Sequence, residues 1–346
     1  MTEHRFLRAA RGERPETTPV WIMRQAGRYL PQYRAIREKV DFLTLCKTPA
    51  LAAEVTVQPV EAIGVDAAIQ FADILLPLEA MGLPLELGDK GPHLPSPVRT
   101  EADIERLVVP DVRDRLGYVM EAISLSVKSL AGRVPLIGFA GAPWTLLAYA
   151  VEGGGSKSYL HAKRLLFERP DLAERLFEKL TQTTIAYLTA QLDAGAQAVQ
   201  LFDSWAGELH PGDYLRLYAS HVARIVEAVK RHRPDAPFIY FGTGMSGMLE
   251  LLPRLGADVI GCDWRVLLST AVERLGEDVV VQGNLDPAAL FLPLPALRDR
   301  VKETLVGGAK AKAHIFNLGH GILPETDPAR ARALVELVHE LGTTSR

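Results

Sequence analysis

Eight short apolar segments alternate with longer amphipathic segments along most of this 346-residue chain. The apolar segments span residues 19–23, 66–71, 135–141, 198–203, 237–242, 258–263, 279–283 and 313–318. Segments that are mostly apolar along their length, rather than strictly alternating with polar residues, are typical of a parallel sheet whose two faces are covered by helices. Helical patterns lie between them at 49–63, 113–131, 160–194, 212–231 and 287–305, and a last one closes the chain at 328–341.

Eight strand and helix units are the number that closes a (β/α)8 TIM barrel. We therefore predict an α/β fold in which residues 1–346 form a single barrel domain, because no low-complexity linker interrupts the pattern. A doubly wound open sheet is the competing architecture. Residues 83–87 are predicted to add a short strand in an insertion after the second unit.

Polar residues recur where the predicted strands end. Arg24, Asp73, Ser204, Asp263 and His320 all lie at or just past the carboxyl end of a strand. In a barrel those ends share one face, and that face carries the active site. The recurrence around the ring therefore predicts a functional site.

The first of these positions combines two arginines with a glycine. Arg24 and Arg28 are separated by Gln25, Ala26 and Gly27. Two guanidinium groups just past a strand end suit the planar, bidentate binding of carboxylate or phosphate. A solvated turn with ordinary surface arginines is the alternative.

Asp73 lies in the segment QFADILLP at 70–77, and its apolar neighbours predict a carboxylate at the end of a buried strand. In an enclosed cavity its field on a ligand would be strong, because water is excluded. The structural alternatives are a helix cap or an ion-pair partner for Arg24 or Arg28.

Two further candidates have equally plain structural alternatives. His320 is flanked by Gly319 and Gly321 on the exit loop of the last strand, where it is either a site residue or a structural histidine. Ser204 either binds a carboxylate through its hydroxyl or amide, or caps the next helix.

Residues 242–247, GTGMSG, match the G-x-G-x-x-G pattern of dinucleotide-binding folds, and Asp263 follows near the spacing of a ribose-binding acid. However, this unit is the fifth of eight rather than the first. A tight turn between strand and helix is the simpler interpretation, although a glycine-rich helix start can also receive a carboxylate.

Composition and net charge limit the kinds of binding partner that this chain is expected to have. The formal net charge is −3 and the isoelectric point about 6.3, so no global basic field indicates nucleic acid. The two cysteines, Cys46 and Cys262, form no CxxC pair, which disfavours a disulfide framework or a zinc knuckle. With no apolar leader and no long apolar stretch, we expect a cytoplasmic protein without a membrane partner.

The segment RQAGRYLP at residues 24–31 resembles the signature of the uroporphyrinogen decarboxylase family. The resemblance continues in FADIL at 71–75, GFAGAPWTL at 138–146, VEGGGSK at 151–157 and NLGHGILP at 317–324. It implies the conversion of the four acetate side chains of uroporphyrinogen III to methyl groups, giving coproporphyrinogen III and CO2 in heme biosynthesis. It further implies a tetrapyrrole polycarboxylate substrate, no cofactor or metal, and a homodimer.

The resemblance also assigns residue roles. Asp73 is implied to face the pyrrole N–H groups and to stabilise a cationic intermediate, with Arg24, His320 and Tyr149 as further catalytic residues. The substrate-binding residues that it implies are Arg24, Gln25, Ala26, Gly27, Arg28, Asp73, Phe139, Tyr149, Ser204 and His320. A core tyrosine is the structural alternative for Tyr149.

Two other functions stay open at this point. A corrinoid-dependent methyltransferase of the same superfamily would need a thiolate-activating zinc with histidine and cysteine ligands. Cys262 has no neighbouring histidine and Cys46 lies in a predicted helix, which disfavours that reading. The other alternative is a non-catalytic tetrapyrrole-binding protein.

Overall fold

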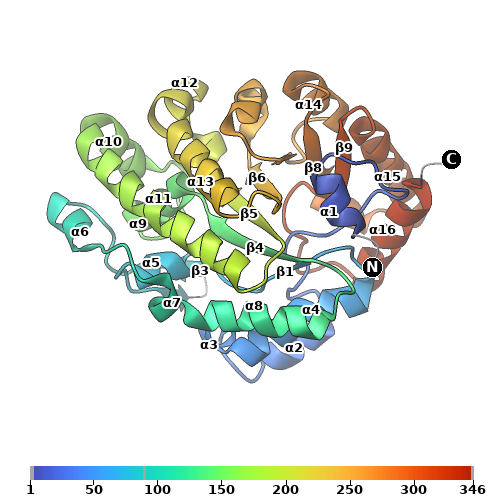
Figure 1. The fold of residues 1–346 in the computed structure, drawn as a ribbon, viewed down its shortest axis with the longest axis horizontal. Helices are drawn as coiled ribbons and strands as arrows, with labels where there is room; N and C mark the ends of the chain where they lie inside the picture. Colours follow the sequence, from blue (N-terminus) through green and yellow to red (C-terminus); the bar gives the residue numbers. More distant parts are fainter. Residues whose placement is uncertain (1–3, 89–90, 344–346) are drawn as a thin grey trace.

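A curved parallel sheet forms the centre of the molecule, and helices surround it (Figure 1). The computed structural model describes residues 4–88 and 91–343. Seven strands are hydrogen-bonded in the order β1-β4-β5-β6-β7-β8-β9, and every pair is parallel. They are β1 (Ala68–Ile69), β4 (Leu136–Gly141), β5 (Ala198–Asp203), β6 (Phe238–Gly242), β7 (Val259–Gly261), β8 (Val280–Leu285) and β9 (Ala313–Leu318).

The first predicted strand, at 19–23, is not a strand of this sheet, so the sheet has seven strands where eight were predicted. Val20 forms only an isolated parallel bridge with Phe316 of β9. On its other side, the Asp66 amide donates to the Val20 carbonyl (2.8 Å). Pairing stops there because the Asn317 side chain accepts the amides of Met23 (3.0 Å) and Leu318 (2.8 Å), which would otherwise continue the ladder.

The strands β5 and β9 have their predicted bounds, whereas β1 and β7 are shorter than predicted. At the start of β7, the Asp258 carboxylate accepts hydrogen bonds from the Phe238 amide (2.7 Å) and from Lys230 (2.8 Å). The Asp258 amide also donates to the Phe238 carbonyl (3.0 Å), so this residue is bonded to β6 through both its backbone and its side chain.

Two helices have their predicted bounds, α4 (Pro49–Ile63) and α16 (Pro328–Leu341). Both begin with proline, whose missing N–H is not needed in the first turn. α4 ends at Gly64 in the left-handed conformation (φ 76°), and the Asp327 carboxylate caps α16 by accepting from the Ala329 amide (2.8 Å). These local signals are readable from sequence.

The longer predicted helices are interrupted. The segment 160–194 divides into α10 (Leu160–Glu168) and α11 (Pro170–Asp193), because Pro170 cannot donate the hydrogen bond that would continue α10. The others divide into α7 (Val112–Arg115) and α8 (Gly117–Leu130); α12 (Pro211–Asp213), the π-helix η2 (Tyr214–Tyr218) and α13 (Ala219–His232); and η5 (Pro287–Phe291) and α15 (Leu294–Gly308).

The remaining helices are short. They are α1 (Arg5–Ala10), α2 (Pro31–Arg37), α3 (Phe42–Lys47), α5 (Leu76–Ala80), α6 (Glu101–Arg106), α9 (Pro143–Glu152) and α14 (Leu268–Leu275), with the 3₁₀ turns η1 (Ala206–Glu208), η3 (Met245–Gly247) and η4 (Leu249–Leu255). None of the helices in the described part of the chain is long and apolar enough to cross a membrane.

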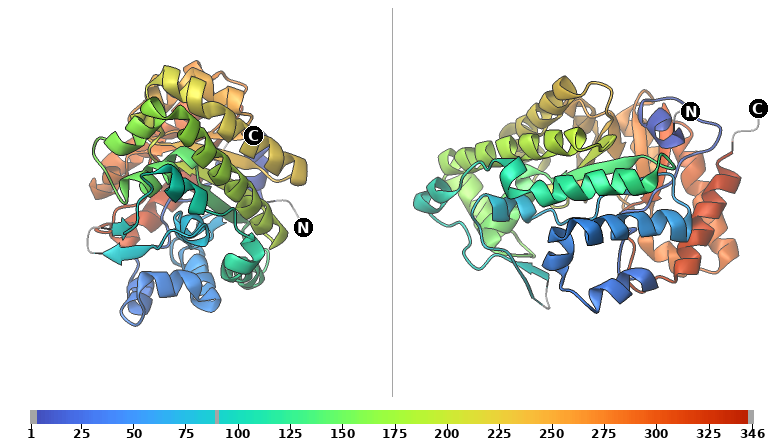
Figure 2. Two further views of the ribbon diagram at one scale, coloured as in Figure 1. Left: turned by 90° about the vertical axis from the view of Figure 1, so that its left-hand side faces the viewer. Right: turned by 60° about the horizontal axis from the view of Figure 1, so that its bottom comes forward.

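An antiparallel hairpin, β2 (Glu86–Gly88) and β3 (Gly91–His93), follows α5, where the sequence predicted a single extra strand. It projects beside the blue helices α2 and α3 (Figure 2). The amide of Leu94, just after the hairpin, donates to the Gly153 carbonyl at the end of α9 (2.9 Å). The hairpin and these helices together wall the carboxyl-end side of the sheet.

Candidate active site

A cavity of about 1280 Å³ lies at the carboxyl ends of the strands. Residues after or within β1, β4, β5, β6 and β9 line it, together with the arginine loop and the hairpin. The predicted site residues among its lining are Arg24, Ala26, Gly27, Arg28, Asp73, Phe139, Ser204 and His320. Gln25 and Tyr149 are not among them.

Arg24 and Arg28 present free guanidinium groups to this cavity. Both side chains are exposed, and no group in residues 4–88 and 91–343 hydrogen bonds or pairs with either guanidinium. Two unpaired cations on one wall, each with a planar set of donors, can bind carboxylates of a ligand. The solvated-turn alternative does not account for their common orientation into a cavity.

The backbone around Arg24 is specialised for this placement. A positive φ is uncommon for a residue with a side chain, and it aims Arg24 back over the strand end. A Cβ at Gly27 would lie 2.9 Å from the Arg24 carbonyl oxygen, and a Cβ at Gly321 would overlap Cδ of Arg24. Both glycines therefore leave the room that Arg24 occupies.

Gln25 supports this loop from beneath. Its side chain is fully buried, accepts a hydrogen bond from the Ile22 amide (3.0 Å) and donates to the Ala67 carbonyl (3.0 Å). The side chain thus ties the loop to the segment that leads into β1. It does not face the cavity, whereas Ala26 and Gly27 do.

Asp73 lies where β1 leads into α5. One carboxylate oxygen, Oδ1, accepts the Leu75 amide (2.8 Å), as the helix-cap interpretation expects, while no described residue bonds to the other oxygen. Within the described ranges, neither Arg24 nor Arg28 forms an ion pair with Asp73. Burial raises the pKa of the Asp73 carboxyl, and the Leu75 hydrogen bond and the charge of Arg24 oppose that rise.

His320 lies half-buried on the loop after β9, with its ring edge-on to Trp264 (ring centroids 6.0 Å apart). Burial, together with the positive charges of Arg24 and Arg265, lowers the pKa of His320 to about 4, and the charge of Asp263 opposes this shift. At neutral pH the imidazole is therefore uncharged. It can donate one hydrogen bond and accept another, but it adds no positive charge to the cavity.

Tyr149 lies on α9 beside the cavity rather than on its surface. Its ring packs against Trp205 (6.0 Å between centroids). Burial raises the pKa of Tyr149, the negative charge of Asp73 adds to the rise and Arg24 opposes it. The hydroxyl is therefore protonated and lies near enough to Asp73 and Arg24 to respond to their charges.

Sequence reasoning missed Arg37, which lines the cavity from the end of α2. A signal was present, since Arg34 and Arg37 follow the arginine loop at helical spacing. Only Arg37 reaches the cavity, because Arg34 instead donates to the carbonyls of Arg28 (2.8 Å) and Tyr29 (3.0 Å). The cavity wall formed by residues 24–37 thus carries three arginines.

Phenylalanine rings line the cavity floor. Phe139 meets Phe202 edge-on (5.6 Å between centroids), and Phe202 meets Phe241 in the same way (6.1 Å). These residues come from β4, β5 and β6, so the floor is built by neighbouring strands. An apolar floor beside an arginine wall suits a flat, apolar ring that carries acidic arms.

The glycine-rich segment 242–247 forms a tight turn, as the simpler interpretation expected. The 3₁₀ turns η3 and η4 follow β6, so no α-helix begins there to bind a pyrophosphate. The Gly244 amide donates to the Asp263 carboxylate (2.5 Å), which also pairs with Arg265 (2.6 Å). Asp263 is thus engaged within the protein rather than held for a ribose.

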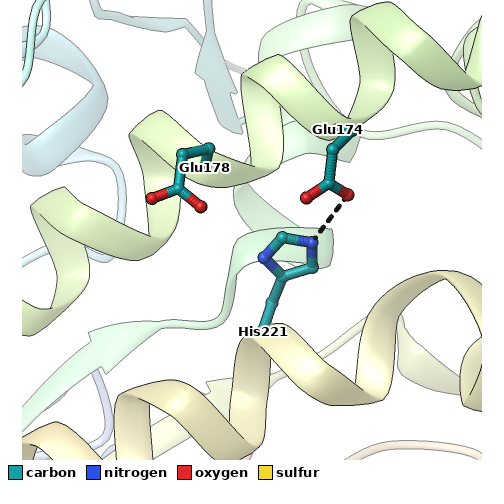
Figure 3. A group of neighbouring side chains, drawn as sticks. All are labelled: Glu174, Glu178 and His221. Atoms are coloured by element: carbon teal, nitrogen blue, oxygen red, sulfur yellow. Dashed lines mark hydrogen bonds and ion pairs between the residues drawn. The ribbon is translucent and has the colours of Figure 1, made fainter.

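Glu174, Glu178 and His221 form the one group of three or more potential metal ligands found in the described ranges (Figure 3). They lie on α11 and α13 and do not line the cavity. His221 bonds to Glu174 (3.1 Å) through Nε2 and to Thr181 (3.2 Å) through Nδ1. Arg224 pairs with Glu178 (2.7 Å), so these contacts join the two helices.

Comparison with known proteins identifies the family. Residues 1–341 match the family model described as "Uroporphyrinogen decarboxylase (URO-D)". A protein of Myxococcus xanthus named uroporphyrinogen decarboxylase is 59% identical over 342 residues, which cover 99% of this chain and 97% of that protein. The chain belongs to the uroporphyrinogen decarboxylase family. A second family member, from Carboxydothermus hydrogenoformans, is 51% identical over 98% of this chain and 97% of its own length.

Solved structures share the fold. A methyltransferase from Methanosarcina mazei superimposes with a TM-score of 0.81 over 97% of both chains, at 22% identity. A B12-independent methionine synthase from Shewanella superimposes with a TM-score of 0.58 over 88% of this chain and 90% of that chain, at 12% identity. At such identities the likeness concerns the fold alone, whereas the decarboxylase relatives match in sequence along nearly the whole chain.

We expect Arg24→Lys to lower kcat/KM by about 10- to 100-fold although the charge is kept. Lysine lacks the planar pair of donors, and a hydrogen bond between charged groups contributes about 1.5–3 kcal/mol. Steady-state kinetics on uroporphyrinogen would measure the loss. Wild-type kinetics would place Arg24 outside the substrate site.

Gly321→Ala changes the position of the Arg24 guanidinium but keeps its chemistry, because a methyl group at residue 321 would displace the Arg24 side chain. Gly247→Ala is the matched control, since a Cβ at Gly247 meets nothing within 4 Å. We expect the first variant, but not the second, to raise KM.

Proposed function

We propose that this protein removes the carboxyl groups from the four acetate side chains of uroporphyrinogen III, giving coproporphyrinogen III and CO2. The observation that carries the proposal is the cavity that joins an arginine wall, an apolar floor and the half-buried carboxylate of Asp73. Membership of the uroporphyrinogen decarboxylase family supports the same substrate.

Each wall of the cavity has a part in this reaction. Arg24, Arg28 and Arg37 bind carboxylates at the rim of the macrocycle, and the phenylalanine floor contacts its apolar face. Asp73 faces the pyrrole N–H groups at the centre. Ser204 and the neutral imidazole of His320 offer hydrogen bonds to further side chains of the substrate.

The substrate's own pyrrole supplies the electron sink. A proton adds to a pyrrole carbon and makes a delocalised cation. The bond between the acetate methylene and its carboxylate then breaks, CO2 leaves, and the electron pair returns to the ring. A second proton adds to the methylene carbon, the first leaves the ring, and a methyl group remains, so the net reaction consumes one proton for each CO2. Asp73 stabilises the cation, which is more charged than the bound substrate.

Two architectural proposals accompany this function. Residues 19–23 occupy the eighth strand position, because Val20 bonds to β9 on one side and to the segment before β1 on the other. On this view residues 1–346 form one (β/α)8 domain. We also propose that the enzyme works as a homodimer in the cytoplasm, as the family resemblance implies.

The deciding experiment incubates the purified protein with uroporphyrinogen III and counts the carboxyl groups of the products. We expect products with seven, six, five and finally four carboxyl groups. Binding without release of CO2 would indicate the non-catalytic tetrapyrrole-binding alternative.

We expect full activity after exhaustive chelation and without any added cofactor. The reaction above needs no metal, since the protonated pyrrole accepts the electrons. Turnover before and after dialysis against a chelator would measure this. Loss of activity that zinc restores would instead favour the methyltransferase alternative.

A further inference from the structure

The loop that follows β7 lies directly behind His320. Its residues Asp263, Trp264 and Arg265 come after a strand that contributes nothing to the cavity lining. A Cβ at Gly319 would overlap the Trp264 amide nitrogen, so the loops after β7 and β9 are in close contact. Any shift of the first loop would therefore move the second, which carries His320.

Two residues outside this loop, Asn284 and Gly244, hold it in place. The Asn284 side chain on β8 donates to the carbonyls of Asp263 (2.8 Å) and Val266 (2.7 Å). The Gly244 amide donates to the Asp263 carboxylate, and so does the Arg265 amide (3.0 Å). A loop bonded to the strands or turns on both sides presents its side chains rigidly.

Within the loop, the Trp264 ring lies between an arginine and a histidine. The Arg265 guanidinium stacks over the ring, 4.0 Å from its centroid, and its NH1 donates to Asp263 (2.6 Å). The ring also meets His320 edge-to-face, with interplanar angle 89°. Stacking and pairing together restrict Arg265 to one position although its side chain is 46% exposed.

We propose that Arg265 is a positioning residue that, with Trp264 and Asp263, fixes both the orientation and the charge state of the His320 imidazole. The inference rests on the proposed function only in its consequence for turnover. The effect of Arg265 on the His320 imidazole can be measured in the substrate-free protein.

The charged groups that act on His320 come from two other loops. Arg24 approaches from the arginine loop, and Arg265 and Asp263 approach from the loop after β7. The glycines on either side of His320 add no charge. Removing the positive charge of Arg265 would leave the buried Asp263 carboxylate without its partner, so the imidazolium form would become easier to reach.

The test follows the Cε1–H resonance of His320 by NMR titration of the substrate-free protein, assigned with His320→Asn. Arg265→Gln removes the charge, yet its amide can still donate to Asp263. We expect the pKa of His320 to rise by about 0.5–1 unit, since solvent screens part of a half-exposed charge. Arg265→Lys, which keeps the charge, should restore most of the wild-type value.

Arg274→Gln is the matched control, because Arg274 also pairs with an acid, Glu250 (2.6 Å), but on α14 and without acting on His320. An unchanged His320 titration in Arg265→Gln, or an equal change in Arg274→Gln, would overturn the proposal. If Arg265→Gln is poorly folded, Trp264→Phe tests the same contact through the ring alone, with an altered His320 chemical shift expected.

Turnover gives the second readout. The acid limb of kcat/KM should move to higher pH by the same amount as the His320 pKa, which a merely structural role would not produce. A shifted titration in a protein that releases no CO2 would refute the proposed function and leave the role of Arg265 intact. If the protein decarboxylates its substrate but the His320 pKa is unchanged in Arg265→Gln, the proposed function stands and the role of Arg265 is refuted.

Discussion

Replacing Asp73 with asparagine is expected to lower the turnover number by about 10²–10³-fold or more. The amide keeps the shape of the carboxylate and can still accept the Leu75 hydrogen bond, but it carries no charge. The cation formed on the pyrrole ring loses its counter-charge, whereas the neutral ring of the bound substrate loses little. A transition-state interaction that is absent from the ground state acts on kcat.

Substrate binding should suffer less than turnover, because the arginine wall still holds the outer carboxylates. Single-turnover kinetics and a binding titration with a non-reactive porphyrin would separate the two effects. If binding is lost while turnover of bound substrate survives, Asp73 is only an anchor. If the asparagine variant melts at a much lower temperature, its cap on the Leu75 amide is its main role.

Asp73→Glu is the matched variant, because it keeps the negative charge of Asp73 but changes its position. It keeps the carboxylate and moves it by about one methylene, so we expect it to retain more activity than asparagine if the cavity tolerates the extra volume. A glutamate variant that is as slow as the asparagine variant would show that placement matters as much as charge.

His320→Asn is expected to slow turnover by about 10²-fold without abolishing it. Asparagine can replace the neutral hydrogen-bond donor of His320 but cannot take up and release a proton. A substrate carboxylate beside the imidazole would raise its pKa from about 4 and let it carry a proton to the reacting carbon. Products with five to seven carboxyl groups should therefore accumulate, as chromatography of the products would show.

His161→Asn is the control for this substitution, since His161 is exposed on α10 and does not line the cavity. It should leave both rate and product distribution unchanged. The same result in His320→Asn would assign His320 a structural role.

The sign of the wild-type pH dependence follows from the depressed pKa of His320. Above pH 4 the imidazole of the free enzyme is neutral, and below it the imidazole is protonated next to Arg24 and Arg265. If the neutral form binds substrate, kcat/KM falls as the pH drops through about 4. A loss centred near pH 6.5, the ordinary value for histidine, would contradict the buried environment of His320.

The sequence by itself determined the features that depend on neighbouring residues along the chain. Apolar runs without alternation predicted the parallel strands, and proline and glycine at its ends marked α4. The segment 24–31 placed two arginines and a glycine at a strand end and indicated the family. Most residues predicted for the site do line one cavity, because strand ends of a parallel sheet must meet on one side.

Only the tertiary structure decided which side chains enter that cavity and in what state. Gln25 is turned beneath the loop, Tyr149 packs against Trp205 away from the cavity lining, and Arg37 lines the cavity where Arg34 does not. Residues 19–23 do not extend the sheet, because the Asn317 side chain takes the amides that would continue their pairing with β9. These outcomes depend on contacts between residues far apart in sequence, which no local pattern contains.

The charge states of the site residues likewise depend on residues that are far apart in the sequence. The sequence marked His320 as a candidate site residue, but its neutral state follows from burial and from the charges of Arg24 and Arg265, which belong to two other loops. A pKa is set by the distance to charges and to water rather than by neighbours along the chain. The sequence therefore named candidate site residues, and packing at the strand ends set the charge of His320 and the directions of the side chains.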